Sequence, residues 1–248
     1  MTSLTVAMPA YNESENIQAM IEDTLHLVGP LVDDLELIVV DDGSRDETAA
    51  VVNRLTAVHP QVRLVQHEVN RGYGTAVWTG LTSATKELVF FTDADRQFDL
   101  REIDKMLAQV TAADLVVGYR KPRRDPLMRR LNGKGWSGLV TLLFGYTARD
   151  IDCAFKLMRR QVIDHLRDEV QSGGATFSAE FLVRAKRAGF RIAEVPIHGH
   201  RPRVAGSPTG AKPAVIVRAF KELVRFRMQL WHEERVVEQP KVGRETAV

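Results

Sequence analysis

Short apolar runs alternate along the chain with longer stretches whose apolar residues recur about every 3.6 positions. The short runs predict strands at residues 4–8, 35–40, 62–66, 88–92 and 115–118. The periodic stretches predict helices at residues 13–27, 46–58, 75–84 and 100–110. Strands that alternate with single helices indicate βαβ units, so this pattern predicts an α/β fold with a mostly parallel central sheet.

The pattern changes after residue 120. Residues 121–130 are basic and rich in proline, which favours a loop or a boundary, and residues 131–146 are apolar with interspersed glycines. A helix at 177–188, a strand at 190–195 and a Gly/Pro loop at 198–212 are expected next. We therefore predict one α/β domain over residues 1–212, an amphipathic helix over 213–234 and a polar tail over 235–248.

Composition narrows the classes of protein. The length of 248 residues suits one α/β domain, and a formal net charge of +2 predicts no nucleic-acid partner. The single cysteine, Cys153, excludes an internal disulfide and is expected to fill space in the core. We see no signal peptide, and no window approaches the roughly 18–20 apolar residues of a membrane-spanning helix. The sequence therefore predicts a cytoplasmic protein that does not cross a membrane, although it can lie on one.

Three polar clusters directly follow predicted strands, at residues 9–13, 41–44 and 93–97. Ligands of parallel α/β sheets bind beyond the carboxyl ends of the strands. We therefore expect the three clusters to converge at one edge of the sheet, and this convergence is stronger evidence for a site than any one motif.

The third cluster predicts a metal site. Asp93 and Asp95 flank one residue at a strand end, so both carboxylates can reach one hard cation such as Mg²⁺ or Mn²⁺, and Gln97 adds a neutral oxygen. Such a triplet also occurs in ordinary surface loops and helix caps. The buried-type run at residues 88–91 directly before it favours the metal site.

The other motifs leave alternatives open. Asp42 is a candidate to accept hydrogen bonds from a nucleobase or ribose, or to cap the next helix, although Asp46 could do the capping. Glu13 is a candidate acceptor for ribose hydroxyls, or it could only favour a helix N-terminus through the dipole. Residues 70–74 form a glycine turn in which Arg71 faces a phosphate or sugar, or a plain tight turn; they lack the third glycine of a dinucleotide fingerprint.

Taken together, residues 6–13, 40–44, 70–74, 93–97 and 152–156 resemble the motifs of family 2 glycosyltransferases, in the same order and spacing. Within that family the chain is most similar to the dolichyl- or polyprenyl-phosphate sugar (mannose) synthases. The resemblance implies a GT-A fold. It also implies inverting, metal-dependent transfer of a sugar from a nucleoside-diphosphate sugar, GDP-mannose or UDP-hexose, to a polyprenyl or dolichyl phosphate.

The resemblance also implies roles for individual residues. The donor would be held by Pro9, Ala10, Tyr11, Glu13, Val40, Asp42, Ala94 and Arg203. The metal, Mg²⁺ or Mn²⁺, would be bound by Asp93, Asp95 and Gln97. The catalytic group would comprise Asp93, Asp95, Arg120 and Asp152. Arg120 would face the acceptor phosphate and Arg203 would close over the diphosphate, although Thr209 stands where the family often has a lysine.

The acceptor decides whether a base is needed. A lipid phosphate is already anionic at neutral pH, whereas a hydroxyl acceptor requires a general base, for which Asp150 or Asp152 is the candidate; the pair could instead be a structural cap. One alternative is therefore a family 2 enzyme that acts on a hydroxyl of a glycan or small molecule. Another is a non-catalytic sugar-nucleotide-binding or peripheral membrane protein. A sugar nucleotidyltransferase is disfavoured because residues 9–13 are not a Gly-rich triphosphate loop.

The second half of the chain carries basic residues beside apolar ones. The first group is Arg120, Lys121, Arg123, Arg124, Arg129, Arg130 and Lys134, and the C-terminal helix carries Arg218, Lys221, Arg225 and Arg227. A basic amphipathic helix with Trp231 near its end suits an anionic membrane surface at the inner face of the cell membrane. The alternative is a terminal helix packed on the domain, and both hold if one end packs and the other touches lipid. His198 and His200 lack further nearby ligands, so they do not predict a metal site.

Overall fold

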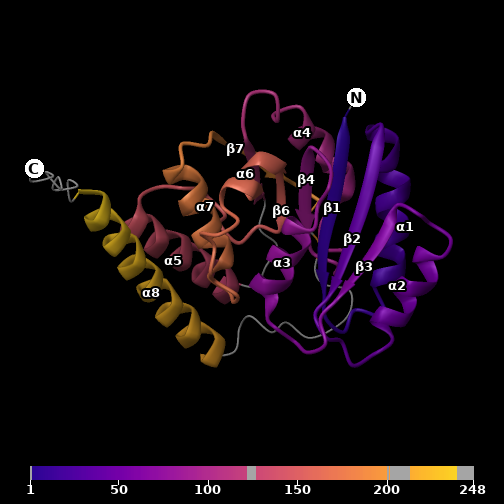
Figure 1. The fold of residues 1–248 in the computed structure, drawn as a ribbon, viewed down its shortest axis with the longest axis horizontal. Helices are drawn as coiled ribbons and strands as arrows, with labels where there is room; N and C mark the ends of the chain where they lie inside the picture. The colour runs from indigo at the N-terminus through magenta and orange to yellow at the C-terminus, as the bar shows by residue number, and fades with distance from the viewer. Residues whose placement is uncertain (1, 122–126, 200, 202–212, 239–248) are drawn as a thin grey trace, which may run out of the picture.

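The computed structural model describes residues 2–121, 127–199, 201 and 213–238, with side chains described at 2–121, 133–199, 201 and 217–235 (Figure 1). The strands are β1 (Ser3–Ala10), β2 (Asp34–Asp41), β3 (Val62–Gln66), β4 (Leu88–Thr92), β5 (Leu115–Arg120), β6 (Phe155–Arg159) and β7 (Ile192–Ile197). The helices are α1 (Ile17–Leu27), α2 (Thr48–Thr56), α3 (Tyr73–Thr82), α4 (Ile103–Leu107), α5 (Leu127–Phe144), α6 (Arg160–His165), α7 (Phe177–Arg187) and α8 (Pro213–Glu238). Short 3-10 turns lie at η1 (Gly29–Leu31) and η2 (Leu100–Glu102).

The described strands form one seven-stranded sheet in the order β3-β2-β1-β4-β6-β5-β7. Neighbouring strands are parallel, except that β6 runs antiparallel to both β4 and β5. Leu37, Ile38, Val39 and Val40 of β2 are all fully buried. Such a continuous apolar strand is expected where helices cover both faces of a sheet. The predicted α/β class and mostly parallel sheet are confirmed.

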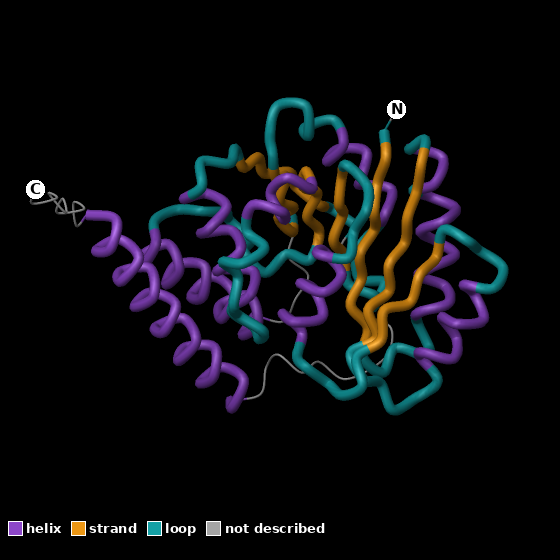
Figure 2. Tube along the Cα trace, viewed as in Figure 1, coloured by secondary structure: helices purple, strands orange, loops and turns teal. Residues whose placement is uncertain are grey.

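Helices lie on both faces of the sheet. α1 and α2 cover one face beside β2 and β3, and α3 covers the other face together with α6 and α7 (Figure 1). α3 approaches the sheet closely, because a Cβ atom at Gly80 would lie 3.2 Å from side-chain atoms of both Ala7 and Val40. The loops that follow β1, β2 and β4 gather at one end of the strands (Figure 2).

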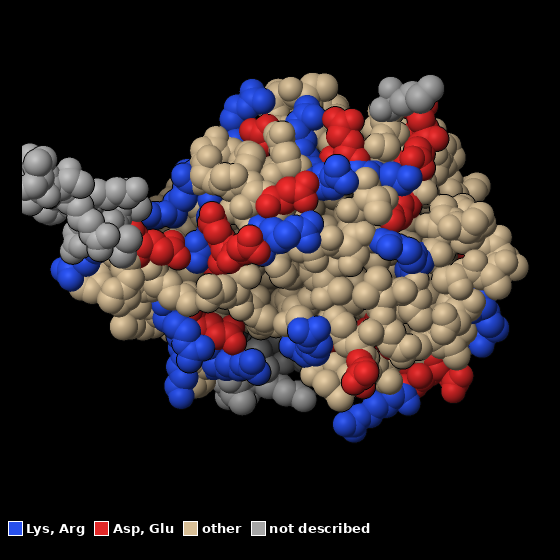
Figure 3. Space-filling view, viewed as in Figure 1, with Lys and Arg blue, Asp and Glu red and all other residues tan. Residues whose placement is uncertain are grey.

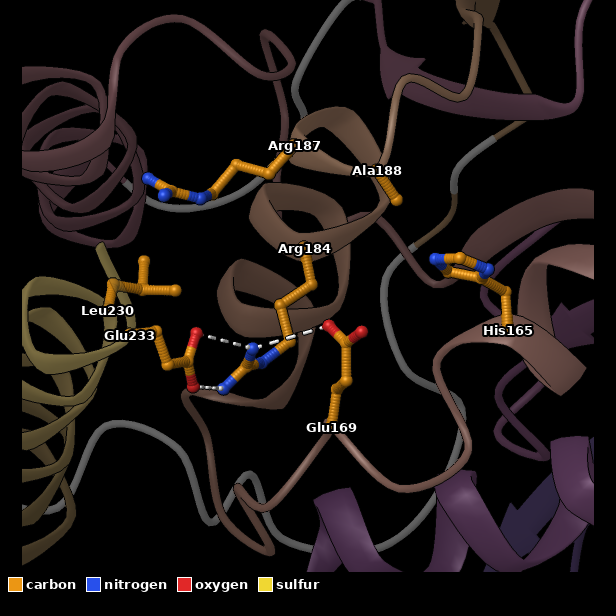
Figure 4. Close-up of a pocket in the computed structure, with 7 residues that line it drawn as sticks. All are labelled: His165, Glu169, Arg184, Arg187, Ala188, Leu230 and Glu233. Carbon is orange, nitrogen blue, oxygen red and sulfur yellow. Dashed lines mark hydrogen bonds and ion pairs between the residues drawn. The ribbon is translucent and has the colours of Figure 1, made fainter. Parts of the chain in front are cut away.

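α8 lies side by side with α5 at one side of the molecule (Figure 1). The rings of Phe144 and Phe226 stack with centroids 5.0 Å apart, and those of Trp136 and Phe220 meet edge to face at 6.3 Å. Figure 4 shows the junction of α7 and α8, where Arg184 bonds Glu233 beside a pocket of about 180 Å³. Among the described helices, none is long and apolar enough to cross a membrane.

The structure departs from the sequence-based expectations at β6, at the start of α1 and at the start of α5. β6 was not predicted as a strand, because Lys156 interrupts the apolar run and nothing local marks an antiparallel insertion between β4 and β5. The expected helix from residue 13 begins only at Ile17, after a turn in which the carbonyl of Glu13 accepts from Asn16 and Ile17. Residues 121–130 were expected as a loop or a boundary; residues 122–126 lie outside the described part, and from Leu127 on the segment is helical as the start of α5.

Candidate active site

The three polar clusters converge at the carboxyl ends of β1, β2 and β4, as expected (Figure 2). Ala10 and Asp41 are paired in register, so the first two clusters leave the sheet side by side. The loops are tied together: the backbone N–H of Asn12 donates to Ser44 Oγ at 2.9 Å, and that of Arg45 donates to Asn12 Oδ1 at 2.8 Å. Asn12 has φ 55°, a left-handed conformation that asparagine tolerates better than most residues.

Asp42 organises the segment that leads into α3. Its side chain is nearly buried, and its carboxylate accepts the backbone N–H groups of Arg71 and Gly72, both at 2.9 Å. His67 Nδ1 lies 2.7 Å from Asp42 Oδ1, and His67 Nε2 lies 3.1 Å from Thr79 Oγ1. Asp42 therefore fixes the turn at residues 70–74 whether or not it also contacts a nucleoside.

Asp46, and not Asp42, serves the first turn of α2. The backbone N–H of Thr48 donates to Asp46 Oδ1 at 3.0 Å and that of Ser14 donates to Asp46 Oδ2 at 3.1 Å. Burial works against the charged form of Asp46, but the hydrogen bonds from Thr48 and Ser14 outweigh it and lower its pKa. The capping interpretation of Asp42 is therefore wrong.

Glu13 is nearly buried and lies before the helix rather than in its first turn. Its carboxylate accepts from the side-chain amide of Asn16 at 2.8 Å, and its backbone N–H donates to Thr48 Oγ1 at 2.9 Å. These contacts hold Glu13 against the start of α2. Its side chain therefore lies at the carboxyl edge of the sheet and does more than interact with the dipole of α1.

The other donor-binding candidates differ in what they expose. Tyr11 is 39% exposed and offers an aromatic face at the edge, and Pro9 is partly buried. The side chains of Ala10, Val40 and Ala94 are buried. Any contact between these three residues and a nucleotide would therefore run through their main-chain atoms.

Asp93 is bonded by a residue that sequence reasoning passed over. Tyr73, the first residue of α3, donates its hydroxyl to Asp93 Oδ1 at 3.0 Å, and its ring meets Phe91 edge to face at 6.4 Å. The protein packed around the Tyr73 hydroxyl and the charge of Asp93 raise the pKa of Tyr73 well above its ordinary value. The phenol therefore keeps its proton and acts as a permanent donor to this carboxylate.

Asp95 and Gln97 are held in a tight turn. Asp95 is 6% exposed, and its Oδ1 accepts the backbone N–H of Gln97 at 3.1 Å. The side-chain amide of Gln97 donates to the carbonyl of Arg201 at 3.0 Å, and the N–H of Arg201 donates to the carbonyl of Gln97 at 2.7 Å. Arg96 has φ 59°, which is uncommon for a residue with a long side chain. The turn thus fixes Asp95 and ties it to the segment after β7.

Arg120 and Asp150 form a bidentate ion pair at the end of β5. Arg120 Nε lies 2.7 Å from Asp150 Oδ2 and a terminal nitrogen lies 2.8 Å from Oδ1, with both side chains largely buried. Because both oxygens of Asp150 are bonded by the guanidinium, Asp150 is the poorer of the two candidate bases. Asp152 is exposed, and its charge acts on both Tyr73 and Lys156, so it belongs with the Asp93 group.

Lys156 is a buried cation behind these carboxylates. It is 2% exposed, its ammonium donates to the carbonyl of Cys153 at 2.5 Å, and it lies 5.6 Å from the centre of the Phe91 ring. Burial lowers the pKa of Lys156, against the opposing effect of the neighbouring Cys153 and Asp152. Burial also raises the pKa of the Cys153 thiol to about 12, which agrees with its expected role as core filler.

His67, which sequence reasoning missed, carried no local signal, and Lys156 stood at the end of the 152–156 motif without an assigned role. Tyr73 stood inside the 70–74 motif, where its position before a helix was the available clue. Arg203 lies outside the described residues, and so does His200. Within the described part of the chain, no group of three or more His, Cys, Asp or Glu side chains is arranged to hold a metal ion.

The model of the family "Glycosyl transferase family 2" matches residues 5–167. The chain belongs to this family. The match covers the three polar clusters, the Arg120–Asp150 pair, Asp152 and Lys156, and ends before α7. The glycosyltransferase class expected from the motifs is therefore confirmed.

Three curated relatives are 30–32% identical to this glycosyltransferase over the aligned residues. Glycosyltransferase AglD of Haloferax volcanii is 32% identical over 78% of this chain, but the chain spans only 32% of AglD. A dolichyl-phosphate beta-glucosyltransferase of Trichomonas vaginalis is 30% identical over 92% of this chain and 72% of its own length. An undecaprenyl-phosphate 4-deoxy-4-formamido-L-arabinose transferase of Photorhabdus laumondii is 30% identical over 65% of this chain and 50% of its own length.

Solved structures agree on the fold. Glucosyl-3-phosphoglycerate synthase from Mycobacterium tuberculosis in complex with phosphoglyceric acid has a TM-score of 0.70 at 22% identity, covering 91% of this chain and 80% of that one. The same protein in complex with Mn²⁺, uridine diphosphate and glucosyl-3-phosphoglycerate gives a TM-score of 0.69 at 21% identity, with the same coverage. The predicted GT-A fold of this family 2 glycosyltransferase is confirmed.

Proposed function

We propose that this glycosyltransferase moves a sugar from a nucleoside-diphosphate sugar to a polyprenyl or dolichyl phosphate, with inversion and with a divalent cation at Asp93 and Asp95. The observation that carries the proposal is the convergence of three polar clusters at the carboxyl ends of β1, β2 and β4, with two carboxylates directly after β4. The printed names of two of the relatives, a dolichyl-phosphate glucosyltransferase and an undecaprenyl-phosphate sugar transferase, support the choice of acceptor.

The donor set fits a hard divalent cation. Asp93, Asp95 and Gln97 offer carboxylate and amide oxygens from one five-residue turn. Mg²⁺ in proteins is typically bound by one or two carboxylates plus substrate phosphates and waters, so a site without a third acidic or histidine ligand is in keeping with that chemistry. When bound, such a cation stabilises the negative charge that develops on the leaving diphosphate. The solved relatives crystallised with uridine diphosphate and Mn²⁺ or Mg²⁺ support this assignment.

The chain's own residues supply the positioning. In the proposal, Pro9, Ala10, Tyr11, Glu13, Val40, Asp42 and Ala94 surround the nucleoside, with the Tyr11 ring as an aromatic face for the base. Tyr73 orients Asp93 through its hydroxyl, and the turn at residues 93–97 orients Asp95. Arg203 is proposed to close over the diphosphate, and it lies outside the described residues.

A lipid phosphate acceptor matches the side chains around the expected acceptor position. Arg120 is proposed to face the acceptor phosphate from the end of β5, with its guanidinium oriented by Asp150. A phosphate oxygen is already ionised at neutral pH, so it can attack without a strong general base. If the acceptor were instead a hydroxyl, Asp152 would be the base, because Asp150 is bonded at both oxygens. The reaction is proposed to take place at the inner face of the cell membrane, where such acceptors would be met.

The test is transfer from radiolabelled GDP-mannose, UDP-glucose and UDP-N-acetylglucosamine to a short polyprenyl phosphate dispersed in detergent, with Mn²⁺ or with a chelator. We expect label to enter the lipid phase with one donor, to require the cation and to be lost in Asp95→Ala. A second variant, Asp152→Asn, separates the acceptors: transfer to a lipid phosphate should survive it. Hydrolysis of every donor without transfer to lipid, or transfer only to a soluble hydroxyl, would refute the lipid-phosphate assignment.

A further inference from the structure

α8 carries two separate apolar faces. Its inner face consists of Ala219, Leu223, Phe226 and Leu230, which are at most 7% exposed. A second row, here called the outer stripe, consists of Val217, Phe220, Val224, Met228 and Trp231, which are 43–56% exposed. Successive members of the outer stripe are three or four residues apart, so they form one continuous line along the helix.

The inner face holds α8 on the molecule, and Phe220 of the outer stripe also meets the Trp136 ring of α5 at 6.3 Å while remaining 49% exposed. The inner face packs through Phe226 against Phe144, and Glu233 receives two hydrogen bonds from Arg184 of α7. The carboxylate of Glu222 accepts from the hydroxyl of Thr176 at 3.0 Å. The sequence had suggested that one end of the helix packs and the other is exposed. In the structure, one face of the helix packs and another face is exposed.

The acidic and basic side chains of α8 also differ in their surroundings. Over residues 217–235 each acidic side chain is paired with an arginine: Glu222 with Arg218, Glu233 with Arg184, and Glu234 with Arg187 and Arg227. Lys221 and Arg225 each follow a stripe residue directly and are exposed, so they form a basic border on one side of the stripe. Arg235 lies over the Trp231 ring at 3.6 Å. Figure 3 shows tan surface at the lower left, over α8, with blue groups at both of its ends.

The helix also lies close to the candidate active site. Figure 1 shows the N-terminal end of α8 on the side of the molecule to which the carboxyl ends of the strands point. Glu222 contacts Thr176 and approaches Gly174, and the neighbouring carbonyl of Gly173 accepts from Thr75 in the first turn of α3. Two residues before Thr75, Tyr73 donates to Asp93.

We infer that the outer stripe of α8 docks on an anionic lipid bilayer, with the helix in the plane of the surface and Lys221 and Arg225 at the headgroups. An apolar stripe with a basic border is the pattern of helices that bind in this way. A second copy of this chain suits the surface less well, because two stripes packed together would bring their basic borders close to one another. The inference extends the proposed function by giving the lipid acceptor a direction of approach, and it rests on that function only for the identity of the acceptor.

Vesicle co-sedimentation tests the docking without any turnover. The wild-type chain is incubated with vesicles of phosphatidylcholine alone or mixed with phosphatidylglycerol, at low and high salt. We expect binding to the mixed vesicles that weakens with salt, and a loss of at least about tenfold in Val224→Asp/Met228→Asp, because two side chains would lose their apolar contact with the bilayer. Val58→Asp is the matched control: Val58 is 67% exposed, lies after α2, and its change should leave binding unaltered.

A second variant probes the charges. Lys221→Gln/Arg225→Gln should weaken binding to the mixed vesicles about fivefold for each charge removed and should reduce its salt dependence. Absence of wild-type binding to the mixed vesicles, or equal loss in Val58→Asp, overturns the inference. So does a concentration-dependent dimer in sedimentation that Val224→Asp/Met228→Asp abolishes, since the stripe would then belong to a second copy.

Activity separates this inference from the proposed function. The stripe variant should transfer sugar to polyprenyl phosphate in detergent as well as the wild type, and should lose transfer to the same lipid embedded in vesicles. If the wild type binds vesicles but never glycosylates the lipid phosphate, the proposed function fails and the docking surface stands. If transfer in vesicles is untouched in the stripe variant, the docking inference fails and the proposed function stands.

Discussion

Replacement of Arg184 by methionine should destabilise the fold more than any other single charge removal at the α7–α8 junction. Arg184 is 4% exposed at its side chain and faces three carboxylates, two of which, Glu169 and Glu233, are drawn in Figure 4. Its guanidinium bonds Glu180 at 2.9 Å, Glu169 at 3.3 Å and Glu233 at 3.1 Å. Burial opposes its charge, but the hydrogen bonds that Arg184 donates to Glu233 and Glu180 outweigh that effect and raise its pKa. Arg184→Met therefore leaves a group of negative charges without its cation.

The expected cost follows from which carboxylate stays buried. Glu180 is 1% exposed at its side chain, and removal of one partner from a buried ion pair costs roughly 3–5 kcal/mol. The backbone N–H groups of Gln171 and Ser172 still donate to Glu180, which favours the lower end of that range. Glu169 and Glu233 are about half exposed beside the pocket and can be rehydrated. For a chain of this size about 3 kcal/mol corresponds to a fall in melting temperature of roughly 6–12 °C.

Urea and thermal unfolding of Arg184→Met, Arg187→Met and Arg184→Met/Glu180→Gln test this expected loss of stability. Arg187→Met is the matched control, because its pair with Glu234 is partly exposed to solvent and should be worth at most about 1 kcal/mol. Arg184→Met/Glu180→Gln should recover much of the lost stability, since no uncompensated charge remains buried. A cost for Arg184→Met no larger than that of Arg187→Met would refute the reasoning, and so would a double variant as unstable as the single one.

Three further outcomes are expected. Tyr73→Phe should raise the Mn²⁺ concentration for half-maximal transfer by about 10- to 100-fold, as loss of a partner behind a metal ligand does; an unchanged metal titration contradicts this. Cys153 should not react with a thiol reagent at pH 8 until the chain is unfolded, because burial raises its pKa to about 12. Since the unfolded thiol ionises first, Cys153 should make stability fall as pH rises above its ordinary pKa. Gly74→Ala should impair folding, because its Cβ would lie 2.6 Å from the carbonyl of Gly174. Gly138 has open space around it, so Gly138→Ala should be neutral or stabilising by about 1 kcal/mol. Equal melting temperatures for the two variants would contradict the close packing at Gly74.

Local patterns of apolar and polar residues were sufficient to predict most strands of the sheet. The bounds of β3 and β4 were predicted to the residue, because both are short apolar runs between polar turns. α8 was predicted from its period, although it continues to Glu238. The start of α5 was missed because a basic, proline-containing segment reads as a loop, while a proline directly before a helix is compatible with its first turn. β6 was missed because antiparallel insertion depends on two distant strands.

The candidate site was likewise predicted in part. Its three clusters were predicted because each follows a strand in the sequence, and parallel strands end at one edge. Their partners were not, since His67 lies 25 residues from Asp42 and Tyr73 lies 20 residues from Asp93, and no spacing rule connects such pairs. The assignment of individual residues to donor, metal and acceptor stays a prediction, as does the division of the chain at residue 212.

The turn at residues 70–74 joins the parts of the molecule that the proposed reaction needs. Asp42 accepts from the N–H of Gly72, and Tyr73 donates to Asp93, so one turn contacts both the second and the third polar cluster. Gly72 has φ 98°, and a Cβ there would lie 2.8 Å from the carbonyl of Gly173. The loop that contains Gly173 leads to Thr176, whose hydroxyl donates to Glu222 of α8. Contacts therefore run without a break from Glu222 of α8 through the loop at residues 173–176 and the first turn of α3 to Asp93. The positive φ of Gly72 and this close packing each disfavour a side chain there, whether or not the turn also contacts a substrate.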